Sequence, residues 1–88
     1  MKVAEKPSID KRAERIGLIT GISDEIYFCS ISRISTVYLE RLNKYEWMAW
    51  RETYLPNSDK LKSHRLIARG GIRYVLSEAK KYIKYVTR

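Results

Sequence analysis

The stretch RLIARGGIRYVL, residues 65–76, decides which fold this sequence predicts. Gly70 and Gly71 stand between two apolar runs, and paired glycines supply the positive φ angles that a two-residue hairpin turn needs. Inside a helix, each glycine would cost about 1 kcal/mol relative to alanine. We therefore expect a basic β-hairpin in which Ile67 faces Tyr74.

A final helix is expected to follow this hairpin, beginning at Ser77-Glu78. Its apolar positions form one stripe and its cations lie on the opposite side. The stripe is Leu76, Ala79, Ile83 and Val86, and the cations are Lys81, Lys84 and Arg88. An alternative extends this helix back to Ile72 and makes residues 59–69 helical as well, which would give a small all-α bundle.

The N-terminal part of the chain carries signals for two helices. Ser8 or Asp10 can cap a first helix that runs to about Leu18. Residues 21–23 then favour a turn. Ser23 is followed by two carboxylates, which suit the free amides and positive dipole at the start of a second helix.

The middle of the chain has apolar residues in steps of three and four, the spacing of an amphipathic helix. They are Ile31, Ile34, Tyr38, Leu42, Tyr45 and Met48 or Ala49. Serine and threonine side chains compete for backbone hydrogen bonds, so a break is expected between about residues 30 and 35. Pro56 predicts the end of the helix near Leu55.

Length and composition set bounds on the class of protein. Eighty-eight residues, of which 44% are hydrophobic and 32% charged, predict one folded domain over 8–88 after a flexible terminus at 1–7. One cysteine and one histidine supply neither an internal disulfide nor a structural zinc site, so no metal or cofactor is expected. Without a signal peptide or a membrane-length apolar run, a cytoplasmic location in the cell or host is expected. The absence of Gln and the frequent Lys, Arg, Glu, Ile and Tyr are compatible with a thermophile.

The positive charge is segregated along the chain. Residues 1–59 hold nine basic and nine acidic side chains, whereas residues 60–88 hold nine basic and one acidic, so the last third carries the whole net charge of +8. Binding of a polyanion would relieve this crowding and release counterions. The segregation favours nucleic acid as partner, ahead of an acidic protein or an anionic membrane surface.

Helix, turn, helix, basic hairpin and closing helix is the order of a winged helix-turn-helix, so we expect a mostly helical α+β fold of this type. Residues 31–42, ISRISTVYLERL, resemble the turn and recognition helix of AlpA-like and phage excisionase proteins, with one extra residue, Ile34. Residues 66–83 are similar to the wing and following helix of the same proteins. The resemblance implies a non-enzymatic factor that binds DNA and assists recombination or transcription.

The expected contacts with double-stranded DNA come from the reading helix, the wing and the last helix. They are Arg33, Ser35, Thr36, Arg41 and Lys44, then Arg65, Arg69 and Arg73, then Lys81, Lys84 and Arg88. Helix capping is the alternative role of Ser35 and Thr36. Tyr82 and Tyr85 interleave with cations, so stacking on single-stranded bases is a second mode of binding.

Specific residues bear on other functional classes. Trp47, Met48 and Trp50 are expected in the core or in a homodimer contact. Glu78-Ala79-Lys80, with Asp59 upstream, resembles the carboxylate and lysine set of a small Mg²⁺-dependent nuclease, although no catalytic residue is expected. The remaining alternative is a viral or plasmid interaction protein that docks on an acidic partner.

Overall fold

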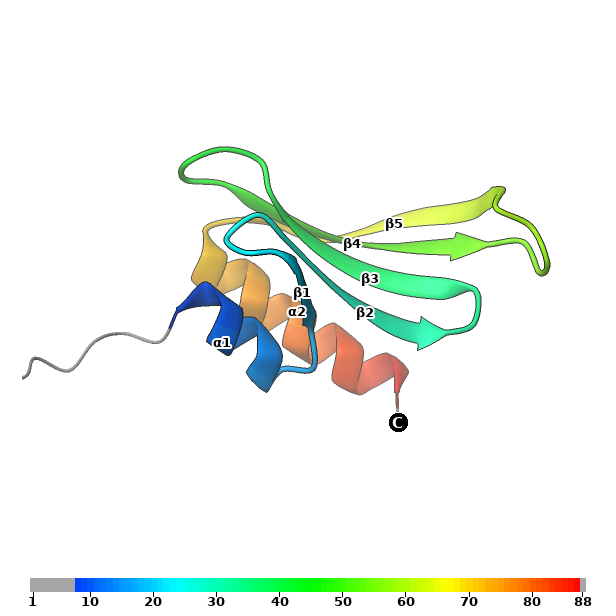
Figure 1. Ribbon diagram of the computed structural model, residues 1–88, viewed down its shortest axis with the longest axis horizontal. Helices are drawn as coiled ribbons and strands as arrows, with labels where there is room; N and C mark the ends of the chain where they lie inside the picture. Colours follow the sequence, from blue (N-terminus) through cyan, green and yellow to red (C-terminus); the bar gives the residue numbers. More distant parts are fainter. Residues whose placement is uncertain (1–7, 88) are drawn as a thin grey trace, which may run out of the picture.

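The computed structural model describes residues 8–87 and consists of a five-stranded sheet with two helices. In chain order the elements are α1 (Ile9–Arg15), β1 (Ile19–Ile22), β2 (Ile26–Ser32), β3 (Ser35–Arg41), β4 (Trp47–Tyr54), β5 (Leu61–Gly70) and α2 (Ile72–Val86). The strands are all antiparallel and lie in the order β1-β2-β3-β4-β5, so each strand pairs with its neighbour in the sequence. Both helices lie on the same face of this meander, and the β4–β5 hairpin extends beyond them (Figure 1). The fold is therefore mainly β.

The winged helix-turn-helix prediction and its all-α alternative are both wrong. Residues 31–42, expected to hold the turn and recognition helix, form most of the β2–β3 hairpin, and the helix expected from Ser23 is the turn between β1 and β2. Most of residues 59–69, expected as a helix in the alternative, belong to strand β5, which begins at Leu61. The predicted terminus at 1–7 and the predicted contact Arg88 lie outside the described residues.

Side-chain alternation explains why the middle of the chain forms strands. Val37 and Leu39 are fully buried, whereas Tyr38 between them points to the opposite face of the sheet. Successive side chains of a strand point to opposite faces, and β-branched and aromatic residues such as these favour a pleated surface. The apparent helical spacing arose because apolar residues of strands and loops fell three and four apart.

The two turns at opposite ends of the sheet use residues that accept a left-handed backbone. Asp24 has φ 61° in the turn between β1 and β2, and Asn57 has φ 57° between β4 and β5. Asp and Asn tolerate this conformation better than other residues with side chains. The turn expected at Pro56-Asn57-Ser58 is present, but it ends a strand and not a helix.

Gly70 and Gly71 connect β5 directly to α2 and do not form the expected hairpin turn. Gly70 has φ 151°, a value that favours glycine, and Gly71 is the N-cap of α2. The helix therefore starts at Ile72, as the alternative expected for this end of the chain, and Ile67 does not pair with Tyr74. The chain reverses here from the last strand of the sheet into a helix beneath it.

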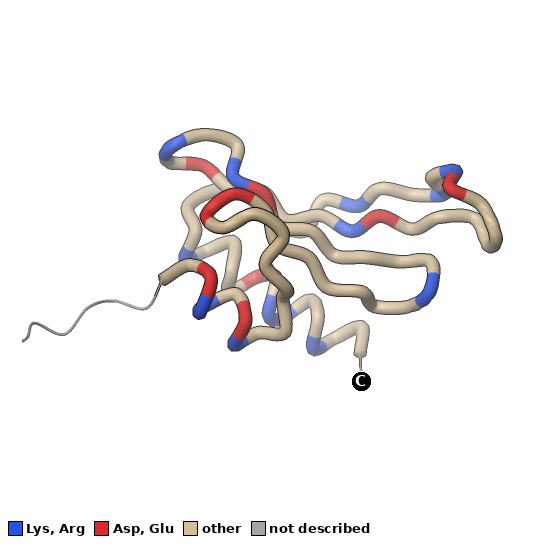
Figure 2. Tube along the Cα trace, in the orientation of Figure 1, with Lys and Arg blue, Asp and Glu red and all other residues tan. Residues whose placement is uncertain are grey.

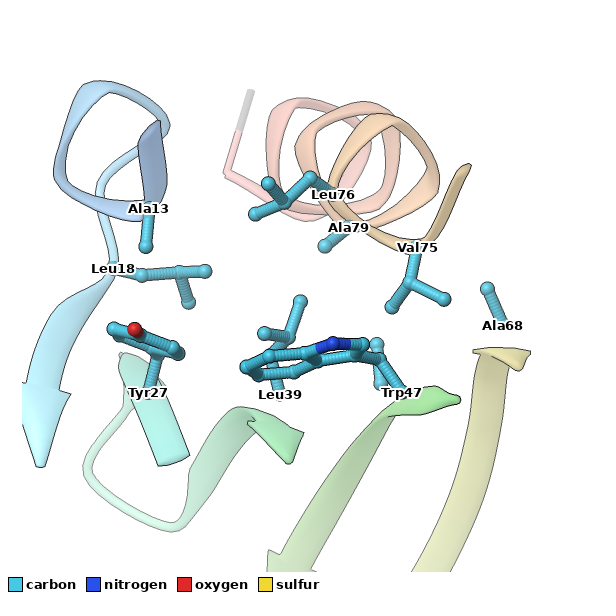
Figure 3. Close-up of a cluster of buried hydrophobic side chains, with 10 residues drawn as sticks. Ala13, Leu18, Tyr27, Leu39, Trp47, Ala68, Val75, Leu76 and Ala79 are labelled. Carbon is cyan, nitrogen blue, oxygen red and sulfur yellow. The ribbon is translucent and has the colours of Figure 1, made fainter. Parts of the chain in front are cut away.

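The core lies between the sheet and the two helices (Figure 3). Tyr27 and Leu39 from the sheet face Ala13 of α1 and Leu76 of α2, and Trp47 packs among them with 2% of its surface exposed. The expected cap of α1 is confirmed, since the Ser8 side chain accepts a hydrogen bond from the amide of Lys11. Burial of each large side chain stabilises the fold by about 1.5–3 kcal/mol.

Hydrogen bonds attach α1 to the first hairpin. The Asp10 carboxylate accepts hydrogen bonds from the hydroxyls of Ser23 and Tyr27. These two bonds, with that from Ser23 the larger influence, lower the pKa of Asp10. Burial, followed by the hydrogen bond to Asp10, raises the pKa of Tyr27. The contacts fix α1 beside the sheet, and thereby fix the positions of its arginines.

No helix within residues 8–87 has the length and apolar character needed to cross a membrane.

Candidate nucleic-acid interface

The positive charge of the described residues is concentrated on the helix side of the molecule. We define the helix-side surface as the cations of both helices together with Arg51 and Arg65, which contact α2 from the sheet. The helical cations are Lys11, Arg12, Arg15, Arg73, Lys80, Lys81 and Lys84. Only three carboxylates accompany these nine cations, at positions 10, 14 and 78, which leaves a net charge of +6.

The rest of the described chain is neutral. It holds six cations, Arg33, Arg41, Lys44, Lys60, Lys62 and Arg69, and six carboxylates, Asp24, Glu25, Glu40, Glu46, Glu52 and Asp59. Figure 2 shows the two signs interspersed along the strands and in the sheet loops, and cations recurring along the helices. The excess charge of the described residues therefore belongs to one side of the molecule.

A groove between α1 and α2 contains four of these cations. Arg12 and Arg15 line it from α1, and Arg73 and Lys80 line it from α2 together with Ser77. No carboxylate lines it. On α2 the cations are seven residues apart, two helical turns, so they lie on one face about 10 Å from each other.

Arg12 is the most constrained cation of this groove. Its Nε atom is buried and has no hydrogen-bond partner in the described structure. A buried donor without an acceptor costs free energy, and like charges in one groove repel each other. A bound anion such as phosphate would reduce this repulsion, and it would reach the buried donor only after the Arg12 side chain moved.

A second basic site lies on the other side of α2, where it faces β5. Arg51 donates a hydrogen bond of 3.0 Å from its Nη1 atom to the hydroxyl of Tyr82. The Arg51 and Arg65 guanidinium carbons lie 6.0 and 5.9 Å from the centre of the Tyr82 ring, close enough for cation-π attraction. Lys81 lies beside this site and pairs with Glu78 at 3.1 Å.

Four of the predicted contact residues belong to this surface. They are Arg65, Arg73, Lys81 and Lys84, all of them exposed. They lie on β5 and α2, because the expected wing does not exist. Arg33 and Lys44 are exposed as well, but they occupy the turns at opposite ends of β3.

Structural roles in the sheet belong to three predicted contacts, which are Ser35, Arg41 and Arg69. Ser35 is 2% exposed and its hydroxyl is hydrogen-bonded to Thr53 and Arg51. Arg41 donates hydrogen bonds to the carbonyls of Asn43 and Lys44 and so orders the β3–β4 loop.

Arg69 forms an ion pair with Glu46 at 2.8 Å. The hydrogen bond from Arg69 lowers the pKa of Glu46. Thr36 points away from the helices, since its neighbour Ser35 points toward them.

Sequence reasoning missed Arg12, Arg15, Lys80 and Arg51. Arg12 and Arg15 are three residues apart in a helix that the sequence does predict, so their shared face was detectable. Their proximity to α2 depends on the tertiary structure.

Other hollows and groups offer less chemistry. A larger hollow of about 1040 Å³ between the β2–β3 turn and the β4–β5 loop is lined by one cation, Arg33, and one carboxylate, Asp59. Asp59 lies in that loop and Glu78 lies on α2, so the residues of the nuclease alternative come from separate elements. Within residues 8–87, no three His, Cys, Asp or Glu side chains gather in a group that could hold a metal ion.

Comparison with protein-family models, with curated proteins and with solved structures finds no match to this chain.

Proposed function

We propose that this protein binds DNA without catalysing a reaction, and that the helix-side surface contacts the phosphate backbone. The observation that carries the proposal is that this surface holds the entire net charge of the described residues, +6, while the remainder is neutral. A field of one sign on one side attracts a polyanion and orients it. Phosphate contacts position a protein on DNA without reading its sequence.

The α1–α2 groove supplies the strongest backbone contact in this proposal. Its arginines have planar donor groups that match phosphate oxygens, and Arg12 already holds a buried donor without an acceptor. Lys84 continues the stripe of Arg73 and Lys80 toward the end of α2. A strand of DNA that lies along this stripe would place its phosphates near these cations and release the counterions bound to them.

The experiment measures binding to a short DNA duplex as a function of salt concentration. The wild-type affinity should fall steeply with salt. In a plot of the logarithm of the binding constant against the logarithm of the salt concentration, the slope should decrease by about 0.9 for each phosphate neutralised. Arg73→Glu with Lys80→Glu should weaken binding by about 100-fold or more, since two attractive contacts become repulsive. Lys60→Glu with Lys62→Glu makes the same change of charge on the β4–β5 hairpin and should have a much smaller effect.

Two outcomes would contradict the proposal. Wild-type protein that does not bind duplex DNA at low salt would exclude the proposed contact with the duplex backbone. Equal losses in the two charge-reversal variants would show that total charge matters and the helix-side surface does not. Retention of one acidic protein from a nuclease-treated extract, with no binding to DNA, would favour the docking alternative.

A further inference from the structure

The cleft between β5 and α2 differs from the α1–α2 groove because it combines cations with aromatic and apolar surface. Its volume is about 290 Å³. Arg65, Leu66 and Ile67 line it from the strand, and Glu78, Lys81, Tyr82 and Tyr85 line it from the helix. Flat aromatic rings beside cations form the usual platform for single-stranded nucleic acid.

Tyr82 is fixed in place and Tyr85 is free to bind. The hydroxyl of Tyr82 accepts the hydrogen bond from Arg51, and two guanidinium groups lie near its ring. Tyr85, three residues further along the same helix, is 70% exposed. On the opposite wall, Ile67 is half-buried and offers an apolar side chain to the cleft. The cleft thus presents unused apolar surface that a flat ligand would cover.

The placement of this apolar surface results from an irregularity in the sheet. The register between β4 and β5 shifts at Ala49/Trp50, so that Ala68 pairs with Ala49 while Leu66 pairs with Trp50. A shift of this kind leaves one residue unpaired and re-aims the side chains beside it. Ile67, the extra residue, packs against the core and lines the cleft, whereas Leu66 lies opposite Trp50 and so points to the face of the sheet away from the helices.

We infer that this cleft holds one unpaired nucleobase, stacked on Tyr85 and packed against Ile67, while Arg65 and Lys81 contact the flanking phosphates. The inference rests on the proposed function, because it assigns a base-binding site to the same surface. A base inside a duplex is stacked on both sides and cannot enter. A base in a single strand, or an extra base opposite no partner, can enter at little cost.

The test compares Tyr85→Ala with Tyr74→Ala. Tyr74 is a matched control, since it lies on the same helix, is 56% exposed and does not line the cleft. The probes are one DNA sequence as a single strand, as a full duplex, and as a duplex with one extra unpaired base. Wild-type protein should bind the single strand and the interrupted duplex more tightly than the full duplex.

Loss of the ring should remove this preference. Tyr85→Ala should weaken binding to the two probes with unpaired bases by about 5- to 100-fold and change binding to the full duplex by less than about twofold. Tyr85→Phe keeps the ring and should bind as wild type does. Tyr74→Ala should change none of the three affinities.

The inference is overturned if Tyr85→Ala and Tyr74→Ala behave alike, or if Tyr85→Ala weakens all three probes equally. In both cases salt-dependent binding by the wild type would leave the proposed function intact. If the wild type binds none of the probes at low salt, the proposed function itself fails. Tyr85 is exposed, so its substitution should leave the folded structure unchanged, which a thermal unfolding curve verifies.

Discussion

The two faces of the sheet carry opposite kinds of surface, although the same strands form both. The helix-side surface is basic and hydrophilic. The other face, which no described element covers, is aromatic and holds no excess of charge (Figure 1). Tyr38, Trp50 and His64 stack there in a row, with ring centres 5.3 and 6.0 Å apart.

Trp50 shows how a large side chain on the uncovered face is shielded from solvent and hydrogen-bonded. It is only 8% exposed, because the rings of Tyr38 and His64 flank it and its indole nitrogen donates a hydrogen bond to Glu52. Glu52 also accepts a hydrogen bond from Tyr54, which raises the pKa of Tyr54 to about 12. These groups of the uncovered face therefore satisfy one another, whereas the helix-side surface has a buried donor, the Arg12 Nε atom, without a partner in the described structure.

The largest expected effect is a difference in stability between substitutions of two neighbouring residues of β3, Leu39 and Tyr38. Leu39→Ala removes a fully buried side chain and should lower the free energy of unfolding by about 2–5 kcal/mol. Tyr38→Ala on the opposite face should cost less, since its ring is only half-buried. Urea denaturation measures both. Equal losses would mean that another molecule, such as a second copy, covers the aromatic face in solution.

Neutralising the arginines of α1 should weaken DNA binding. Arg12→Gln with Arg15→Gln should reduce duplex affinity by about tenfold at moderate salt and flatten the salt slope by about 0.9 for each lost contact. Arg33→Gln with Lys44→Gln removes the same charge from the turns at the ends of β3. An equal loss of duplex affinity in this control variant would show that the DNA interface extends beyond the helix-side surface.

The link between Asp10 and the first hairpin predicts a pH dependence of stability. Since its pKa is lowered in the folded protein, first by the hydrogen bond from Ser23 and then by that from Tyr27, Asp10 stabilises the fold above its ordinary pKa of 3.8. This stabilisation is lost as the pH falls through the lowered value. Asp10→Asn should therefore unfold at a lower temperature than wild type near neutral pH, and the difference should shrink in acid. If the difference in unfolding temperature did not depend on pH, the charge of the Asp10 carboxylate would not be its cause.

The smallest effect is expected at Arg69. This residue belongs to the basic third of the sequence, but Glu46 neutralises it and it lies outside the helix-side surface. Arg69→Met should change DNA affinity by less than about twofold, because an exposed ion pair contributes little. A loss of fivefold or more in a binding titration would place DNA against the aromatic side.

Helical signals at the two ends of the chain were readable from the sequence. The cap at Ser8 is confirmed, as is the buried stripe of Leu76 and Ala79 on the last helix, with Ile83 packed against the same core. These features depend on side chains only a few residues apart. Gly70 and Gly71 were recognised as a reversal, but a strand-to-helix reversal and a hairpin demand the same backbone freedom, so the wrong one was predicted.

The strands were missed because both faces of the sheet carry apolar residues. In β3, Val37 and Leu39 enter the core while Tyr38 joins the aromatic row, so three consecutive apolar residues obscure the period of two at the centre of the strand. The charge segregation along the sequence was a partial guide to the candidate site. The helix-side surface omits Lys60, Lys62 and Arg69 from the basic third and gains Lys11, Arg12, Arg15 and Arg51, an exchange that depends on the packing of α1 and α2.

The nearest-neighbour order of the strands also has a consequence for how the chain folds. Every strand pairs with the one before it, and α2 returns onto β5 without an intervening loop. Ordering one hairpin places the next strand beside a formed edge, so no long loop must close before contacts form. Folding rates rise as contacting residues lie closer in sequence. We expect this chain to fold faster than a sandwich of equal length whose sheet partners are distant in sequence.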